Sequence, residues 1–186
     1  LSFDRIMSEM QKIFNLNECV NILFVMQETG VFDYITRGLL IDINMLKKAI
    51  GNNIQMDWKM KIAVLLYKNK EVGAMWPNAV KSMINFYHQH IKSDVVDVLC
   101  KGVGARISIN FLLLLRALKS DDFGINYKMY NKYLNLLTDF PVTGKELILN
   151  GVAVGPKIGD ILFEMKHKWI KADGKTSKSE LMQVLN

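Results

Sequence analysis

The sequence predicts an all-α protein, and three observations lead to that prediction. Apolar residues recur at three- and four-residue intervals through almost the whole chain, as they do on one face of a helix. No stretch of four to eight residues alternates strictly between two turn signals, and no Asn-Gly pair stands where a hairpin needs one. The segments between periodic runs are short, so neighbouring helices should pack nearly antiparallel. We expect about ten helices and no significant sheet.

The first half of the chain divides into five predicted helices, most of which follow a residue suited to an N-cap. Ser2 precedes a helix whose apolar face includes Ile6 and Met10, and Gly30 ends the second helix. In chain order, the five segments are 2–14 behind Ser2, 17–28 behind Asn17, 42–51 behind Asp42 and Asn44, 57–68 behind Asp57, and 78–92 behind Asn78.

The next segments contain the most apolar helix of the chain. Asp94 begins a helix over 95–99, and Gly102 and Gly104 separate it from a helix over 105–119. The apolar run within that helix is about a dozen residues long and includes Arg116, whereas a membrane span needs about 20. We therefore expect it to be buried in a protein core. Residues 121–124 are expected to form a loop, and 127–137 a helix behind Asn126.

A proline marks the start of a C-terminal subdomain, which we place after the segment 140–144. Farther on, Gly155-Pro156 puts a proline at the first position of a helix, where its missing N–H costs nothing. The N–H groups of Lys157, Ile158 and Gly159 should then be free to bind an anion, with the Lys157 ammonium beside them. The alternative is an ordinary capped surface helix with solvated lysines. On either interpretation, the helix packs by one apolar face, formed by Ile158, Ile161, Leu162, Met165 and Trp169.

Charge is distributed unevenly along the chain, which carries a net +6 with a pI near 9.2. Residues 1–46 contain 3 basic and 6 acidic side chains, 47–139 contain 14 and 7, and 140–186 contain 7 and 5. This pattern suggests that the later part faces an anionic partner, with nucleic acid the leading candidate. The apolar half of the composition excludes intrinsic disorder, and Cys19 and Cys100 are too isolated for a disulfide scaffold.

Catalytic and metal-binding motifs are absent from the sequence. Gly174-Lys175-Thr176 suggests a phosphate-binding loop, but the earlier glycine that the motif requires is replaced by Trp169. His88 and His90 are two positions apart on a predicted helix, so they point to different faces and are poorly placed to chelate one metal. We expect no catalytic residue and no metal site in this chain.

Tyrosines alternate with lysines along the predicted helix 127–137. Tyr127, Tyr130 and Tyr133 form a stripe with Lys128 and Lys132 between them. Such a stripe can stack on nucleotide bases. We favour the alternative, in which the tyrosines belong to the core and their hydroxyl groups reach its edge.

Two groups of residues resemble conserved motifs of one enzyme family. The first is Pro141-x-Thr143-Gly144-Lys145-x-Leu147, followed by Gly151, Gly155-Pro156-x-Ile158-Gly159-x-x-Leu162, Trp169 and a final Ser/Glu/Leu helix. It resembles the tail of bacterial class II CCA-adding tRNA nucleotidyltransferases and of the related bacterial poly(A) polymerases. The second is Leu1-Ser2-x-x-Arg5-Ile6-x-x-Glu9, which is similar to the last neck motif of that family, with Asp4 where Glu is usual. Met26-x-x-Thr29-Gly30-Val31-Phe32 resembles the next neck helix and its turn, while the middle of the chain carries little signature.

The resemblance implies a neck over 1–46, an RNA-binding body over 47–139 and a tRNA-binding tail over 140–186. Body and tail of the family hold the acceptor and TΨC arms of tRNA through phosphate contacts and present the 3′ end to a catalytic head. The head, with its glycine pair and D-x-D carboxylates, is not in this sequence. The chain is therefore expected to be part of a longer cytoplasmic protein, inactive alone and without a membrane partner. Mg and CTP or ATP are expected to be cofactor and substrates only of the full-length protein, whose own N-terminal head is the implied second partner.

Individual residues follow from the same resemblance. Arg5 and Glu9 would support the nucleotide site from the neck, although an ordinary i, i+4 surface ion pair is an alternative. The candidate RNA contacts are Gly155, Lys157, Gly159, Lys145 and Lys166 in the tail, and Lys101 and Arg106 in the body. Two other functions remain open: the same portion of a poly(A) polymerase, and a helical protein-interaction module with no RNA role.

Overall fold

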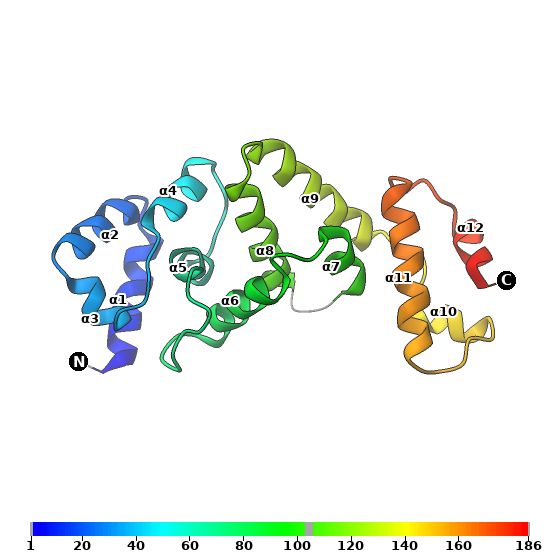
Figure 1. Ribbon diagram of the computed structural model, residues 1–186, viewed down its shortest axis with the longest axis horizontal. Coiled ribbons are helices and arrows are strands. Elements are labelled where there is room, and N and C mark those ends of the chain that lie inside the picture. The colour runs from blue at the N-terminus through cyan, green and yellow to red at the C-terminus, as the bar shows by residue number, and fades with distance from the viewer. Residues whose placement is uncertain (1, 103–105, 186) are drawn as a thin grey trace. The chain divides into compact units, whose positions relative to one another are not determined.

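A computed structural model describes residues 2–102 and 106–185 of the protein, and those residues form helices and connecting segments without a strand (Figure 1). The predicted all-α class is confirmed. Leu1, in the neck motif, and Gly104, between two predicted helices, lie outside the described residues. The helices are α1 (Phe3–Asn15), α2 (Cys19–Glu28), α3 (Val31–Thr36), α4 (Ile43–Gly51), α5 (Trp58–Leu66), α6 (Asn78–His90), α7 (Val95–Lys101), α8 (Arg106–Lys119), α9 (Phe123–Thr138), α10 (Gly144–Leu149), α11 (Pro156–Lys171), α12 (Lys178–Met182) and the 3₁₀-helix η1 (Gln183–Leu185).

The chain folds into two compact units, and each of them is discontinuous in sequence. The first unit comprises Leu1–Ile91 and Arg106–Asp121, and the second comprises Lys92–Ala105 and Asp122–Asn186. The first thus holds α1–α6 and α8, and the second holds α7 and α9–α12. The division into neck, body and tail assigns roles to segments, and it stays a prediction.

The core of the first unit is built around α8, the helix that the sequence predicts to be the most apolar. Its residues from Phe111 to Leu115 are all buried, and the helix packs against α6, α5 and α4. In α5, Ile62–Leu66 are also buried. Because α8 carries apolar side chains on nearly every face, it is stable only when neighbouring helices surround it. The predicted core helix is confirmed.

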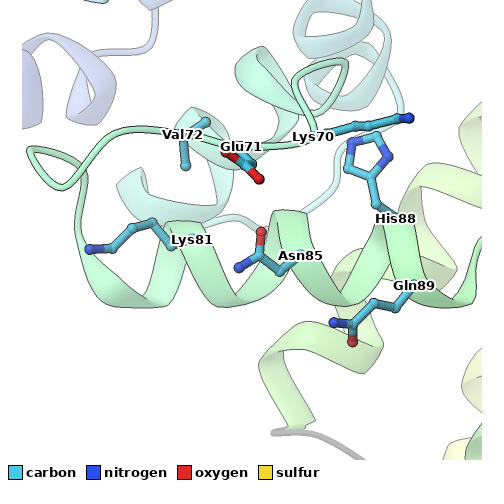
Figure 2. Close-up of a pocket in the computed structure, with 7 residues that line it drawn as sticks. All are labelled: Lys70, Glu71, Val72, Lys81, Asn85, His88 and Gln89. Carbon is cyan, nitrogen blue, oxygen red and sulfur yellow. The ribbon is translucent and has the colours of Figure 1, made fainter.

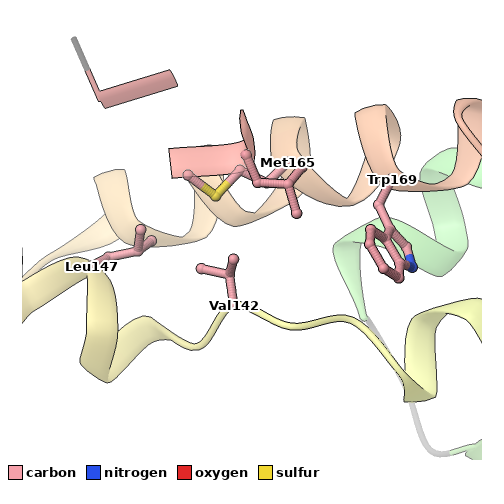
Figure 3. Close-up of a cluster of buried hydrophobic side chains, with 5 residues drawn as sticks. Val142, Leu147, Met165 and Trp169 are labelled. Atoms are coloured by element: carbon pink, nitrogen blue, oxygen red, sulfur yellow. The ribbon is translucent and has the colours of Figure 1, made fainter. Parts of the chain in front are cut away.

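The second unit contains a separate cluster of buried side chains (Figure 3). The members come from the segment before α10 and from α10, α11 and α12: Val142, Leu147, Met165, Trp169 and Leu181. The other three residues of the predicted apolar face of α11, Ile158, Ile161 and Leu162, pack against this cluster. The predicted packing face is confirmed.

Two helix starts differ clearly from the predictions, and two short helices are not predicted. The second helix begins at Cys19 behind Glu18 instead of at Asn17. The predicted loop at 121–124 is correct only for 121 and 122, because α9 already begins at Phe123, whose ring stacks on Tyr127 one turn later at 5.3 Å. The short helices α3 and α10 are not predicted. Gly30 ends α2 as expected, but its left-handed φ of 72° turns the chain directly into α3.

Many helix C-termini are satisfied by side chains that come from elsewhere in the same unit. The last carbonyl groups of a helix have no partner within the helix, so they attract cations and N–H donors. In the first unit, Lys61 donates to Phe14 O of α1, His88 to Tyr67 O behind α5, Arg116 to His90 O of α6, and Lys48 to Leu118 O of α8. In the second unit, Lys166 donates to Cys100 O of α7, Trp169 to Leu136 O of α9, and Lys168 to Glu180 O of α12.

Asp42 joins α4 to the end of α5. Its carboxylate caps α4 by accepting from Met45 N at 2.9 Å, and it also accepts from Tyr67 Oη at 3.1 Å and Lys68 Nζ at 3.0 Å. Burial by itself raises the pKa of Asp42, but the hydrogen bonds and the Lys68 charge outweigh it, so the pKa is lowered. Burial and the negative charge of Asp42 raise the pKa of the Tyr67 hydroxyl, which stays protonated and donating.

We predict that Asp42→Asn lowers the free energy of unfolding at neutral pH by about 1–3 kcal/mol, because it removes hydrogen bonds to a charged group. The pKa of Asp42 is lowered in the folded state, so its contribution is present above the unfolded pKa, near 3.9, and is lost as pH falls through the folded pKa. Urea denaturation followed by circular dichroism at pH 7 and pH 3 measures both effects. The difference between the two proteins should be smaller at pH 3 than at pH 7; an equal difference at both values would contradict the assignment.

Candidate nucleic-acid interface

The start of α10 and the start of α11 lie at the same end of the tail (Figure 1). Thr143 and Glu146 form a capping box that begins α10. Directly after the cap, a Cβ on Gly144 would stand 3.3 Å from Cγ2 of Ile158, which is the third residue of α11. The absence of a side chain at 144 therefore lets the two first turns approach each other. Lys145 follows Gly144 in the sequence, and Lys157 precedes Ile158. Both lysine side chains are exposed.

The beginning of α11 has most of the predicted features. Gly155 is the N-cap and Pro156 is the first helical residue, as expected. Gly155 and Gly159 are exposed, and open space lies where a Cβ on either would project, so a ligand can approach the backbone closely. The expectation that the Ile158 N–H is free is wrong, because it donates to Gly155 O at 3.2 Å in a tight first turn.

A cavity of about 640 Å³ beside α11 limits the direction from which an anion can approach. Lys157 lines it together with two carboxylates, Asp160 and Glu164, and with apolar residues that include Val184 and Leu185. A phosphate inside this cavity would meet the two negative charges. An anion bound by Lys157 is therefore favoured at the helix end, beside Gly155, and disfavoured in the cavity.

The remaining candidates of the second unit lie at the contact between α7 and α11. Lys166 is half-buried, and its ammonium donates to Cys100 O at 3.3 Å, so it satisfies the end of α7. Lys101 is exposed and its Nζ lies 5.7 Å from the centre of the Phe163 ring. Beside Lys166, His167 Nε2 lies 2.9 Å from Oδ1 of Asp97. Lys166 thus has a structural partner, whereas Lys145 and Lys157 form no hydrogen bond or ion pair with any described residue.

The candidates of the first unit are all at the surface. Arg106 is the first residue of α8 and is exposed. Arg5 and Glu9 are exposed on α1. The Glu9 carboxylate pairs with Lys12, three positions later, at 2.8 Å. The alternative i, i+4 ion pair between Arg5 and Glu9 therefore does not form. Both partners of the Lys12 pair are well solvated, and the pair contributes little to stability.

The tyrosines of α9 lie at the edge of the second unit. Tyr127, Tyr130 and Tyr133 are all half-buried, and no residue of α9 is fully buried. This partial burial is what rings at the edge of the core would show, as the favoured interpretation expects. They cover the edge of the core and leave part of each ring accessible.

A polar pocket in the first unit is not predicted from the sequence (Figure 2). It has a volume of about 680 Å³ and lies between α6 and the segment that connects α5 to α6. Its lining residues are Lys70, Glu71 and Val72 from that segment and Lys81, Asn85, His88 and Gln89 from α6. The polar residues of α6 recur at intervals of four and three, so helical periodicity next to a basic connecting segment was the available signal.

Possible metal ligands of the described residues do not gather into a site, and the two cysteine thiols are buried. No three His, Cys, Asp or Glu side chains of the described ranges gather closely enough to hold a metal ion. Cys19 and Cys100 are buried free thiols, and burial raises the pKa of Cys100 to about 12, so its thiol stays neutral. None of the helices in the described part of the chain has the length and apolar character needed to cross a bilayer.

Comparison with known proteins gives no relative: no family model, no curated protein and no solved structure matches the chain. The resemblance to tRNA nucleotidyltransferases therefore stays a prediction.

We predict that Lys166→Met lowers the free energy of unfolding by about 0.5–2 kcal/mol, because it removes a charged donor from the carbonyl end of α7 while keeping the apolar stem. Lys145→Met is the matched control, since Lys145 is exposed and contacts no described partner; its effect should stay within about 0.5 kcal/mol. Urea denaturation followed by circular dichroism compares them. Equal stability of the two variants would show that Lys166 is not a helix-capping residue.

Proposed function

We propose that the chain is the RNA-binding part of a tRNA nucleotidyltransferase that adds CCA to tRNA 3′ ends. In this proposal, the chain holds the acceptor and TΨC arms of tRNA for a catalytic head whose motifs are not in this sequence. One observation supports the proposal most strongly. Some residues of the tail motif build the local fold, and others are exposed and free to bind.

The first group of motif residues accounts for the local fold. Thr143 caps α10, Gly144 allows its close contact with Ile158, Leu147 is buried in the cluster of Figure 3, and Pro156 begins α11. Each of these four motif residues therefore has a structural role. They also fix the relative position of the two helix starts.

The second group is exposed at the end of the tail that the first group builds. Gly155 and Gly159 leave the backbone accessible, and Lys145 and Lys157 add two charges without a described partner. Exposed backbone at a helix N-terminus with two cations beside it suits the phosphate groups of RNA. Mg and CTP or ATP would be needed only where the catalytic head is present, in the cytoplasm.

A protein-interaction module is the second candidate, and one observation favours it. Leu149, the last residue of α10, and Val154, shortly before α11, are 83% and 81% exposed in the same tail. Large apolar side chains left so open are suited to a protein partner. A poly(A) polymerase would share the phosphate contacts and differ in preferring an unstructured strand.

We predict that the chain binds tRNA with an affinity that falls steeply between 50 and 200 mM salt, as phosphate contacts require. Fluorescence anisotropy with labelled tRNA measures it. The double variant Lys145→Met/Lys157→Met should weaken binding about tenfold or more and reduce the salt dependence by about two ion equivalents. Lys171→Met, an exposed lysine at the other end of α11, is the control and should change the affinity less than about twofold.

A glycine substitution tests the backbone contact separately. Gly159→Ala has open space for its methyl group and should leave the fold intact or slightly more stable, yet it should weaken tRNA binding by blocking close approach. Gly124→Ala, likewise exposed and unobstructed in α9, is the control.

The remaining outcomes separate the candidate functions. If the Lys145/Lys157 variant binds tRNA like Lys171→Met, the tail site is wrong. If an oligo(A) strand binds better than tRNA, the poly(A) polymerase is favoured. If no RNA binds at low salt, the RNA-binding function is wrong, and the interaction module remains.

A further inference from the structure

The pocket between α6 and the connecting segment combines groups of two chemical kinds. Lys70, Lys81, Asn85 and Gln89 offer N–H donors. The ionised carboxylate of Glu71 can only accept hydrogen bonds. A bare phosphate would suit the lysines but not the carboxylate. The ligand must therefore carry both an anionic group and a hydroxyl or amine that donates.

Apart from His88, the polar side chains of the pocket are not engaged by other described residues. Within residues 2–102 and 106–185, the side chains of Lys70, Glu71, Lys81, Asn85 and Gln89 form no hydrogen bond or ion pair. This distinguishes them from the cations that satisfy helix ends, such as Lys48 and Lys61. The groups are free to bind a ligand without breaking a bond in the fold.

Charged and polar groups of α6 and of the connecting segment follow one another along the pocket. Figure 2 shows Lys81 at one end of the pocket, the Glu71 carboxylate pointing toward Asn85 in the middle, and Lys70 above His88 at the other end. Lys81 and His88 are seven residues apart, which is about 10 Å along the helix. Two cations flank one acceptor, as two phosphates flank one ribose hydroxyl along a strand. The four-carbon lysine stems can reach the phosphates from either side.

His88 fixes one wall of the pocket. Its Nε2 lies 2.9 Å from Tyr67 O, and because a carbonyl only accepts, Nε2 carries the proton of that bond. The ring orientation is thereby held by the end of α5. The volume of about 680 Å³ is within the range of pockets that hold small molecules.

We propose that this pocket binds a ribose-phosphate unit of an RNA strand, with Lys70 and Lys81 on phosphates and Glu71 accepting from a 2′-hydroxyl. The inference rests on the proposed RNA-binding function and adds a second contact, in the first unit. A free ribonucleotide offers the same chemistry on a shorter ligand. The 2′-hydroxyl gives the pocket a means to distinguish RNA from DNA.

The test uses the 186-residue chain with a labelled single-stranded oligoribonucleotide and the deoxy oligomer of the same sequence, measured by fluorescence anisotropy. Lys70→Met/Lys81→Met should lower the affinity for the RNA oligomer about tenfold and reduce the salt dependence of binding by about 1.4 ion equivalents. Lys47→Met, an exposed lysine of α4, is the control and should change it less than about twofold. Glu71→Gln should lower the affinity for the RNA oligomer about threefold or more. The affinity for the deoxy oligomer should stay unchanged or rise. Circular dichroism verifies that each variant is folded.

Each contrary result overturns a defined part of the inference. Binding by Lys70→Met/Lys81→Met equal to that by Lys47→Met overturns the site. Equal improvement of RNA and DNA binding in Glu71→Gln overturns the ribose contact, because the carboxylate then only repels phosphate. Free AMP is the third probe. If AMP binds as tightly as the RNA oligomer, and binds more weakly to Lys70→Met/Lys81→Met, the ligand of the pocket is a free nucleotide and the proposal of an RNA strand is overturned.

The same measurements separate this inference from the proposed function. If tRNA binding depends on Lys145 and Lys157 but not on Lys70 and Lys81, the pocket is wrong and the RNA-binding tail stands. If the unaltered chain binds neither tRNA nor the oligomer, both are wrong.

Discussion

The fold of this protein depends on hydrogen-bond donors for the carbonyl groups at the ends of its helices. Even the longest helices of the described chain have 16 residues, and several have fewer than ten, so a large share of the backbone lies in terminal turns. The last carbonyl groups of a helix need donors, and at several helix ends these donors are Lys, Arg, His and Trp side chains of other elements. A donor from another element also joins the two elements, so the same bonds that complete a helix hold its neighbour in place.

This use of cations changes what the charge of the chain means. The excess of basic residues after residue 46 suggests an extended surface for an anionic partner. The structure divides those residues into two groups. Lys48, Lys61 and Lys166 donate to carbonyl groups, and Lys68, Lys132 and Lys178 pair with carboxylates. The lysines without a described partner include Lys145 and Lys157 in one unit and Lys70 and Lys81 in the other. The number of basic side chains available to an anionic partner is therefore smaller than the charge count implies.

Part of the fold could be predicted because its causes are local. The apolar run of α8, the proline that begins α11 and the glycine that ends α2 act over one or two turns, and all three were predicted correctly. The capping box of α10, Thr143 with Glu146, is an equally local signal for the start of a helix. The start of α9 depends on Phe123 packing on Tyr127. That contact outweighs the turn preference of the residues before it.

The sequence alone determined the helical class, the main core helix and the proline that begins α11. Each follows from residue type and spacing within a few positions, which is the range over which helical periodicity and capping act. Tertiary structure decided which cations are free. Lys48 and Leu118 are 70 positions apart, and Lys166 and Cys100 are 66 apart, so no local pattern shows that these ammonium groups are engaged. The pocket of Lys70 and Lys81 likewise exists only because a connecting segment lies over one face of α6, and packing, not spacing, brings those charges together.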